Sequence, residues 1–265
     1  MNNLLIVAHR GASYAAPENT IPSFELALKE NADFIEGDFW LTNDNEIVCI
    51  HDPNTKRVTG GKNNLNVRRS TLSELKKLDV GIWKGERYKG ATIPSLQEVL
   101  QIIPKEKGIY IEIKDNREIC VIKLVEILKR FSISPDKIRI ITFHPNTVQL
   151  AKKYLPEIKA YWLFSSYFQK KKCLKYLAQK RLIQTLQTIN CDGIDVNAGP
   201  YIDMKLVKLF RDSHLDFCAY DVNELDDAIK LINLGVDSIT TDFPLKMRKE
   251  IEKHLFYLLH SDYKK

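Results

Sequence analysis

The chain has 265 residues, of which 44% are hydrophobic and 28% are charged. This balance is typical of a globular protein with a large buried core and excludes a disordered or fibrous chain. The formal net charge of +6 comes without a basic stripe interleaved with aromatic residues and without a recognisable nucleic-acid motif. We therefore expect no nucleic-acid partner and a preference for anionic substrates.

Short β-branched runs alternate with longer amphipathic segments, which is typical of βα units repeated around a parallel sheet. Eight such runs predict strands, and eight is a number that closes a barrel. Barrels of about 250 residues fold as one unit. We therefore predict an α/β protein, a (β/α)8 TIM barrel, with residues 1–265 as a single domain. The predicted strands are residues 4–9, 34–39, 109–114, 139–143, 159–164, 193–196, 216–220 and 238–241.

Amphipathic segments predict helices between these strands. Before the first helix, Asn19 or Thr20 is expected to act either as a helix cap or in catalysis. Before the helix at residues 224–234, Asn223 is a natural N-cap, and apolar residues follow it at helical spacing. The predicted helices are residues 21–31, 117–131, 145–155, 172–189, 203–213, 224–234 and 244–259.

Residues 53–93 interrupt this alternation. They are rich in Gly, Asn, Lys and Arg, and only residues 71–78 predict a weak helix. Residues 46–50, just before them, are predicted to pair with the second strand as a hairpin. We interpret residues 53–93 as a small insertion after the second strand, over one mouth of the barrel. Loops at the carboxyl ends of barrel strands carry the chemistry, so the insertion would shape substrate access.

The cysteines and the apolar runs predict the compartment. Five cysteines form no C-x-x-C pair, and three of them lie inside apolar runs, so buried free thiols in a reducing compartment are expected. The first residues lack the positive region and the apolar length of a signal peptide, and no apolar stretch is long enough to span a membrane. We expect a cytoplasmic enzyme without a membrane span, whose oligomeric state stays open.

Three acidic residues near predicted strand ends indicate a metal site. Glu36 and Asp38 are two residues apart on one strand, so their side chains leave the same face. Glu112 lies at the matching end of the next barrel strand. Like charges this close repel unless a cation lies between them. A ligand set of oxygen atoms without cysteine suits Ca²⁺ or Mg²⁺, with Mn²⁺ also compatible, while the alternative is a group of ordinary surface acids.

Two histidines and two cations accompany these carboxylates. His9 ends the first predicted strand and His51 follows the hairpin strand, and a free imidazole exchanges protons near neutral pH. One histidine is expected to be the base and the other the acid, in either order. Arg10 has a planar guanidinium that fits two phosphate oxygens, and Lys114 adds a point charge. Together these residues predict a metal-assisted phosphate-ester site.

Five segments, taken in order, resemble the signature of the glycerophosphodiester phosphodiesterase family. The resemblance continues through residues 93–98, 220–223 and 235–244, so it spans nearly the whole chain. The five segments are Ala8-His9-Arg10-Gly11, Pro17-Glu18-Asn19-Thr20, Glu36-x-Asp38, His51-Asp52 and Ile111-Glu112-Ile113-Lys114.

This resemblance implies a barrel of the phosphatidylinositol-phosphodiesterase type. It implies hydrolysis of small glycerophosphodiesters to sn-glycerol 3-phosphate and an alcohol such as choline or ethanolamine. In the family's mechanism, the free glycerol hydroxyl attacks phosphorus to give a cyclic phosphate, which water then opens. By similarity, the cation ligands are Glu36, Asp38 and Glu112, the acid-base pair is His9 and His51, and the phosphate ligands are Arg10 and Lys114.

Four positions depart from the family pattern, all outside the expected metal and acid-base residues. They are Tyr220, Asp221, Phe243 and His144, where the family usually has Trp, Thr, Arg and Asn. The departures fall at the expected substrate rim, so they leave the identity of the released alcohol open. Two alternative functions are also open. One is a lipid-acting lysophospholipase D or phosphoinositide-type phospholipase, with residues 161–164 and Trp83 as an apolar rim. The other is a barrel that binds phosphodiesters without catalysis.

Overall fold

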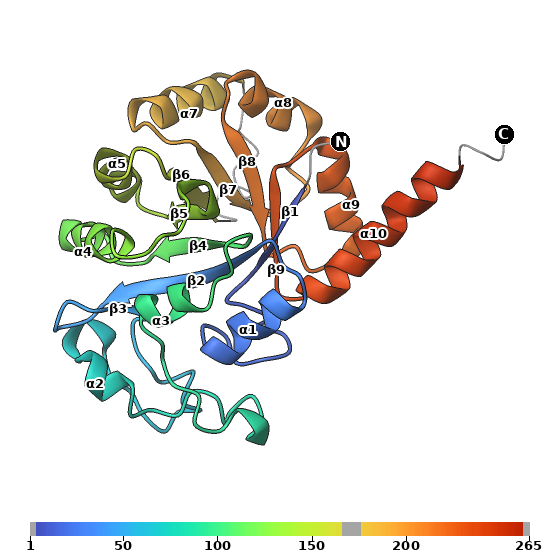
Figure 1. Ribbon diagram of the computed structural model, residues 1–265. Helices are drawn as coiled ribbons and strands as arrows, with labels where there is room; N and C mark the ends of the chain where they lie inside the picture. Colours follow the sequence, from blue (N-terminus) through green and yellow to red (C-terminus); the bar gives the residue numbers. More distant parts are fainter. Residues whose placement is uncertain (1–3, 166–175, 262–265) are drawn as a thin grey trace.

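A parallel barrel forms the centre of the protein, and the computed structural model describes residues 4–165 and 176–261 (Figure 1). Eight parallel strands follow one another around the barrel in the order β1, β9, β8, β7, β6, β5, β4 and β2, and β2 pairs with β1 to close it. The barrel strands are β1 (Leu5–Ala8), β2 (Phe34–Leu41), β4 (Gly108–Ile113), β5 (Ile138–Thr142), β6 (Lys159–Phe164), β7 (Gly193–Asn197), β8 (Asp216–Tyr220) and β9 (Ser238–Thr241).

The predicted TIM barrel is therefore confirmed, and each predicted strand is present with boundaries within two residues. The largest difference is β2, which extends beyond the predicted residue 39 to Leu41. The extension has a partner, because Trp40 and Leu41 pair with Val48 and Ile47 of β3 (Ile47–Cys49), an antiparallel strand outside the barrel. The predicted hairpin is thus confirmed as well.

Helices surround the strands on the outside, as Figure 1 shows, and α10 extends past the barrel. Their inner faces pack against the outward side chains of the strands. The helices are α1 (Ile21–Lys29), α2 (Leu72–Leu75), α3 (Leu96–Gln101), α4 (Glu118–Leu128), α5 (Pro145–Tyr154), α7 (Tyr176–Thr188), α8 (Met204–Asp212), α9 (Leu225–Leu234) and α10 (Pro244–Ser261), with short 3-10 turns at Val67–Arg69, Glu86–Tyr88 and Pro135–Lys137.

Three helix predictions need correction or completion. The helix predicted at residues 71–78 is only one turn, α2, held at its start by a capping box between Thr71 and Glu74. α3 was not predicted, although Ser95 and Glu98 form the same type of capping box at its start. α7 covers residues 176–188 of the helix predicted at 172–189, and residues 172–175 lie outside the described part of the chain.

Asn223 is not the N-cap of α9, which was the expectation from its position. The N-cap residue is Glu224, and its side chain makes no capping hydrogen bond. The Asn223 side chain instead binds Asp242 and Thr241 beside β9. A tertiary contact has therefore displaced the local capping preference of this asparagine.

Two layers of apolar side chains hold the barrel together. The larger layer lies between strands and helices, as expected for parallel strands that are buried on both faces. A smaller group fills the barrel interior and includes Phe34, Tyr110, Tyr161 and Leu163. Because these bulky side chains close the interior, polar chemistry is confined to its carboxyl-terminal end.

The insertion between β3 and α3 has a small apolar core of its own, which includes Val58, Val67, Leu75 and Ile93. It also contacts the loop between β1 and α1. Lys84 Nζ donates to the Ser13 carbonyl at 2.8 Å, and the Tyr88 hydroxyl donates to the Ala15 carbonyl at 2.7 Å. The insertion therefore lies against one of the loops that form the mouth of the barrel.

Two further expectations concern cysteines and membrane spans. Cys49, Cys120, Cys191 and Cys218 are buried and free, as predicted, and Cys173 lies outside the described residues. Within residues 4–165 and 176–261, no helix combines the length and the apolar character needed to cross a bilayer.

Candidate active site

A cavity of about 180 Å³ opens at the carboxyl ends of the barrel strands. Six of the seven predicted site residues line it, and the seventh, Asp38, is fully buried beside the acidic residues of its wall. Apolar and aromatic side chains, including Ile141, Leu163 and Phe143, complete the lining. The predicted site residues on the wall are His9, Arg10, Glu36, His51, Glu112 and Lys114.

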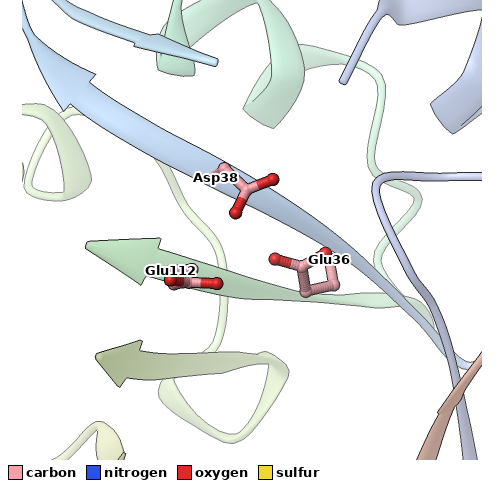
Figure 2. Close-up of side chains that lie close together, drawn as sticks. All are labelled: Glu36, Asp38 and Glu112. Carbon is pink, nitrogen blue, oxygen red and sulfur yellow. The ribbon is translucent and has the colours of Figure 1, made fainter. Parts of the chain in front are cut away.

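Glu36, Asp38 and Glu112 form one carboxylate cluster, in which the potential ligand atoms all lie within 4.8 Å of one another. Figure 2 shows the three side chains leaving the same face of two neighbouring strands. The arrangement follows from register, because Asp38 of β2 lies beside Glu112 of β4 and Glu36 precedes Asp38 by one strand period. The three residues are buried, with at most 9% of the surface of each residue exposed.

The charge in this cluster is only partly compensated. Burial and the charge of Asp38 raise the pKa of Glu36 to about 8 and that of Glu112 to about 7. Burial opposes ionisation of Asp38 too, but the cations of Lys114 and Arg10 hold the pKa of that carboxyl well below its ordinary value. Electrostatic repulsion among the carboxylates therefore favours an additional cation.

Two buried oxygens of the cluster are also left without a hydrogen bond. Glu36 Oε1 and Asp38 Oδ1 have no hydrogen-bond partner among the described residues, although Lys114 Nζ forms an ion pair with Asp38 Oδ1 at 3.2 Å. Buried carboxylate oxygens that accept no hydrogen bond are unusual, and carboxylate oxygens are the ligands that Ca²⁺ and Mg²⁺ prefer. The cluster therefore fits a hard divalent cation better than it fits a purely structural role.

The loop after β1 brings Arg10 to this cluster through an unusual backbone conformation. Arg10 has φ of 53°, and its backbone N–H donates to Glu36 Oε2 at 2.8 Å. Gly11 follows with φ of 81°, and a Cβ there would lie 2.1 Å from Ser23 Oγ. Only glycine fits this close approach to α1. The Gly11 position thus lets the chain turn so that a main-chain donor reaches a predicted metal ligand.

Asn19 and Thr20, the two residues that precede α1, have separate roles. Thr20 is the helix cap, and its side chain accepts from the backbone N–H of Ser23. The Asn19 side chain donates to Asp38 Oδ2 at 2.7 Å and accepts from the Asp38 backbone N–H at 3.1 Å. The cap expectation is therefore confirmed for Thr20, whereas Asn19 holds a carboxylate of the cluster and a part for it in catalysis stays a prediction.

His9 forms a dyad with Asp242, at the end of β9. Its Nδ1 lies 2.8 Å from Asp242 Oδ1, which also accepts from the Ser13 hydroxyl at 2.8 Å. Asn223 Nδ2 donates to the other Asp242 oxygen. Burial opposes protonation of His9, but the Asp242 hydrogen bond and the charge of Glu36 raise its pKa to about 9. With Nδ1 bound to a carboxylate, Nε2 is the nitrogen that can exchange a proton with a ligand.

His51 forms a second dyad, with its neighbour Asp52. Its Nδ1 lies 2.7 Å from Asp52 Oδ1. Burial and the nearby cations Lys114 and Arg10 lower the pKa of His51, although Asp38 and Asp52 act in the opposite direction. The two histidines of the cavity thus have the same type of partner but pKa values shifted in opposite directions. Such a pair can divide acid and base roles.

The two predicted phosphate ligands are held by carboxylates. Arg10 Nη1 donates to Glu18 Oε1 at 3.0 Å, and Arg10 Nε lies 3.1 Å from Asp38 Oδ2. Lys114 Nζ donates to Glu112 at 2.7 Å and lies 3.2 Å from Asp38. Both cations are largely buried and line the cavity, where an anion would meet them.

Three residues that orient the site, and one buried carboxyl of the barrel interior, were not predicted as site residues. Asp242 and Asn223 occur in segments that resemble the family, but only their positions after strands hinted that they approach His9. Arg57 comes from the insertion, where no pattern indicates it. Asp195 of β7 is 1% exposed, both of its carboxylate oxygens lack a partner among the described residues, and burial raises its pKa to about 8.

The cavity rim contains two of the four departures from the family pattern. Tyr220 and Asp221 line the cavity, and Asp221 Oδ1 lies 3.8 Å from His9 Nδ1. Phe243 stacks on the exposed Tyr14 ring at 4.2 Å. The fourth, His144, is the N-cap residue of α5.

Most of the β6 residues suggested as an apolar rim for a lipid-acting enzyme are buried. Tyr161, Leu163 and Phe164 are buried, because they belong to the barrel packing, although Leu163 also reaches the cavity wall. Trp83 of the insertion is 41% exposed. Tyr161, Leu163 and Phe164 therefore serve as core, while Trp162 of the same run is only partly buried.

The metal-free protein is expected to lose stability as the pH rises from roughly 6.5 to 8.5. Glu36, Glu112, Asp195 and His9 all have raised pKa values in the folded protein. In this interval the folded state binds more protons than the unfolded state, so the free energy of unfolding falls with pH. Thermal melts in a chelator should show a midpoint several degrees lower at the upper pH.

A matched variant and an ion addition test this account of the pH dependence. Asp195→Asn should weaken the dependence, because it removes one of the groups that titrate, and adding Mg²⁺ or Ca²⁺ should restore stability most at high pH. A melting midpoint that stays constant or rises over this pH interval in chelator would show that the buried carboxyls do not have raised pKa values.

Comparisons with known proteins are consistent with this geometry. Residues 9–246 match the profile of a protein family that is described as "Glycerophosphoryl diester phosphodiesterase family". A glycerophosphodiester phosphodiesterase of Caldanaerobacter subterraneus is 31% identical over 244 residues, which cover 91% of this chain and 94% of that protein. A human lysophospholipase D is 35% identical over 132 residues, which cover 48% of this chain and 41% of that protein.

A solved structure gives the same result for the fold. It is an Oleispira antarctica phosphodiesterase in complex with the product sn-glycerol 3-phosphate, with a TM-score of 0.80 and 29% sequence identity. The superposition covers 94% of this chain and 96% of that one.

Proposed function

Because the chain belongs to the glycerophosphoryl diester phosphodiesterase family, an enzyme family, we propose that it hydrolyses glycerophosphodiesters to sn-glycerol 3-phosphate and an alcohol. One observation carries the proposal: three buried carboxylates and two His–Asp dyads meet at a single cavity. Two dyads offer a base and an acid, and the carboxylates offer a cation site. General acid-base catalysis and a divalent cation each speed cleavage of a phosphodiester, and this cavity has residues suited to both.

We assign the cation site to Glu36, Asp38 and Glu112, with Mg²⁺ or Ca²⁺ as the ion. When bound, such an ion supplies Lewis acidity and balances negative charge that develops on the phosphoryl group. Two of these carboxylates also hold Lys114. The cation and Lys114, which we assign to phosphate binding, therefore share these two carboxylates.

Arg10 and Lys114 are the proposed phosphate ligands. Arg10 and Lys114 line the cavity, and each forms ion pairs with two carboxylates. Such preoriented cations stabilise the extra negative charge of a pentacoordinate phosphorus without a large rearrangement. We expect them to contribute to substrate binding and to the rate.

His9 and His51 are the proposed acid-base pair. One imidazole removes the proton from the free glycerol hydroxyl, whose oxygen attacks phosphorus, and the other imidazole donates a proton to the departing alcohol oxygen. The products of this step are a cyclic glycerophosphate and the free alcohol. Water then opens the ring, and the two imidazoles exchange roles, which returns each to its starting protonation state.

The proposed substrates are small and water-soluble, because the cavity has a volume of about 180 Å³ and three of the four β6 residues considered as an apolar rim, Tyr161, Leu163 and Phe164, are buried. We also propose a cytoplasmic location, supported by the four buried free thiols. The domain assignment of residues 1–265, with residues 53–93 as the insertion, belongs to the same proposal.

An assay of several diesters tests the proposed function. Glycerophosphocholine, glycerophosphoethanolamine and lysophosphatidylcholine should be compared with Mg²⁺, with Ca²⁺ and with chelator. We expect release of sn-glycerol 3-phosphate from the first two, its loss in chelator, and recovery when either ion is added back.

Two results would support the alternatives instead. Turnover confined to lysophosphatidylcholine would favour a lipid-acting enzyme, and binding of the diesters without product would favour a non-catalytic barrel. A Glu36→Gln preparation purified in parallel shows whether any product comes from a contaminating hydrolase.

A further inference from the structure

Arg57, a residue of the insertion, links two carboxylates beside the proposed site, Glu18 and Asp52. Its guanidinium makes four hydrogen bonds to two carboxylates. Nη1 and Nη2 donate to Glu18 at 2.6 and 2.9 Å, and Nε and Nη2 donate to Asp52 at 2.9 and 3.2 Å. This is a fork between two partners, and it uses all three guanidinium nitrogens.

Each of these carboxylates orients a different residue of the cavity. Glu18 Oε1 accepts from Arg57 Nη2 and also from Arg10 Nη1, so it lies between two guanidinium groups. Asp52 Oδ1 accepts from Arg57 Nη2 and is also the partner of His51 Nδ1. Arg57 therefore contacts both the carboxylate that binds Arg10 and the carboxylate that binds His51.

The Arg57 backbone is held firmly by the insertion around it. Thr55 and Thr59 are buried, and the Thr59 backbone N–H and hydroxyl both donate to the Thr55 carbonyl. Val58 packs in the small apolar core of the insertion. The Arg57 side chain is 44% exposed, so its role does not come from burial of its own surface.

We propose that Arg57 is a positioning residue that fixes Asp52 and Glu18 together, and through them holds His51 and Arg10 in one arrangement for the substrate. This inference rests on the proposed function and adds a role for the insertion in catalysis. Arg57 is not one of the residues that line the active-site cavity, so it acts through Glu18 and Asp52. A small displacement of a base or a phosphate ligand can lower a rate by about 10².

The test compares Arg57→Ala with wild type on glycerophosphocholine in the presence of Mg²⁺. We expect kcat/KM to fall by roughly 10²-fold, with kcat lowered through His51 and KM raised through Arg10. Guanidinium added at millimolar concentration should restore part of the activity of Arg57→Ala and should not increase the activity of wild type. Arg57→Lys should recover only part of the loss, because a single ammonium cannot replace the fork.

Arg68→Ala is the matched control within the same insertion. Arg68 is similarly exposed, at 40%, and Arg68 Nε donates to the buried Asp115 at 3.1 Å, but it contacts neither dyad. Its activity should stay within about twofold of wild type. Thermal melts of all variants distinguish unfolding from displacement of His51 and Arg10. If Arg57→Ala does not fold, Arg57→Lys is compared with wild type instead.

A double-mutant cycle completes the experiment. Arg57→Ala and Glu18→Gln should be strongly non-additive, because each removes the same contact. Additive losses, no effect of guanidinium, or equal losses in the Arg57 and Arg68 variants would overturn the inference. Wild-type turnover in the same assay keeps these results distinct from a failure of the proposed function, which would appear as an inactive wild type.

Discussion

Replacing His51 by alanine is expected to lower kcat by about 10³-fold while the protein stays folded. General acid-base groups commonly contribute 10²–10⁴-fold, and the proposed mechanism uses His51 in both steps. Folding should persist because Trp40 Nε1 donates to the His51 carbonyl, a backbone contact that alanine retains. His9→Ala should show a loss of similar size. The measurement is kcat at saturating substrate, with a thermal melt for each variant.

His214→Asn is the control for a histidine outside the cavity. His214 lies after α8, at the opposite end of β8, with φ of 57°, a conformation that asparagine tolerates. Its kcat should match that of wild type. If His51→Ala and His9→Ala both keep full activity, the proposed acid-base pair is wrong.

The same two variants can identify the acid. A glycerophosphodiester with p-nitrophenol as its alcohol has a leaving group that needs no proton. The variant that lacks the acid should therefore regain most of the lost rate with this substrate, while the variant that lacks the base should not. Equal losses of both variants on both substrates would show that neither histidine protonates the leaving group.

Replacing Glu36 by glutamine should abolish the response to divalent ions and lower turnover by at least about 10³-fold. Glutamine keeps the shape of the side chain and can still accept from the Arg10 backbone N–H. Since burial raises the pKa of Glu36 to about 8, the folded metal-free protein already favours its neutral form near pH 7. The variant in chelator should therefore be at least as stable as wild type.

Wild type and variant should differ once an ion is present. An ion at about 100 times its dissociation constant stabilises a folded protein by about 2.7 kcal/mol. Wild type should gain this stability, and Glu36→Gln should gain little. Asp195→Asn, which changes another buried interior carboxyl outside the cluster, should respond as wild type does. A full ion response in Glu36→Gln would remove Glu36 from the cation site.

Strand periodicity explains why the central part of the site could be predicted from sequence. Glu36 and Asp38 share a face because they are two residues apart on a strand, and Glu112 joins them because parallel strands end at the same edge. The eight strands could be predicted because short β-branched runs alternate with longer amphipathic segments along the chain. These features depend on local patterns, which a sequence displays directly.

The residues that orient the site depend on contacts between distant segments. Asp242 reaches His9 across 233 positions of sequence, and Arg57 reaches Glu18 across 39. Asn223 was assigned to a helix cap because its local pattern fits one, whereas its side chain binds Asp242. Local propensity cannot distinguish such alternatives, because the competing partner comes from another element.

The most direct test of the central claim is the position of a bound ion. Crystals grown with Ca²⁺ should show one anomalous peak among Glu36, Asp38 and Glu112, with carboxylate oxygens at about 2.3–2.6 Å. The same crystals of Glu36→Gln should lack it. A peak elsewhere in protein that hydrolyses glycerophosphocholine, with no ion among these three carboxylates, would contradict the account.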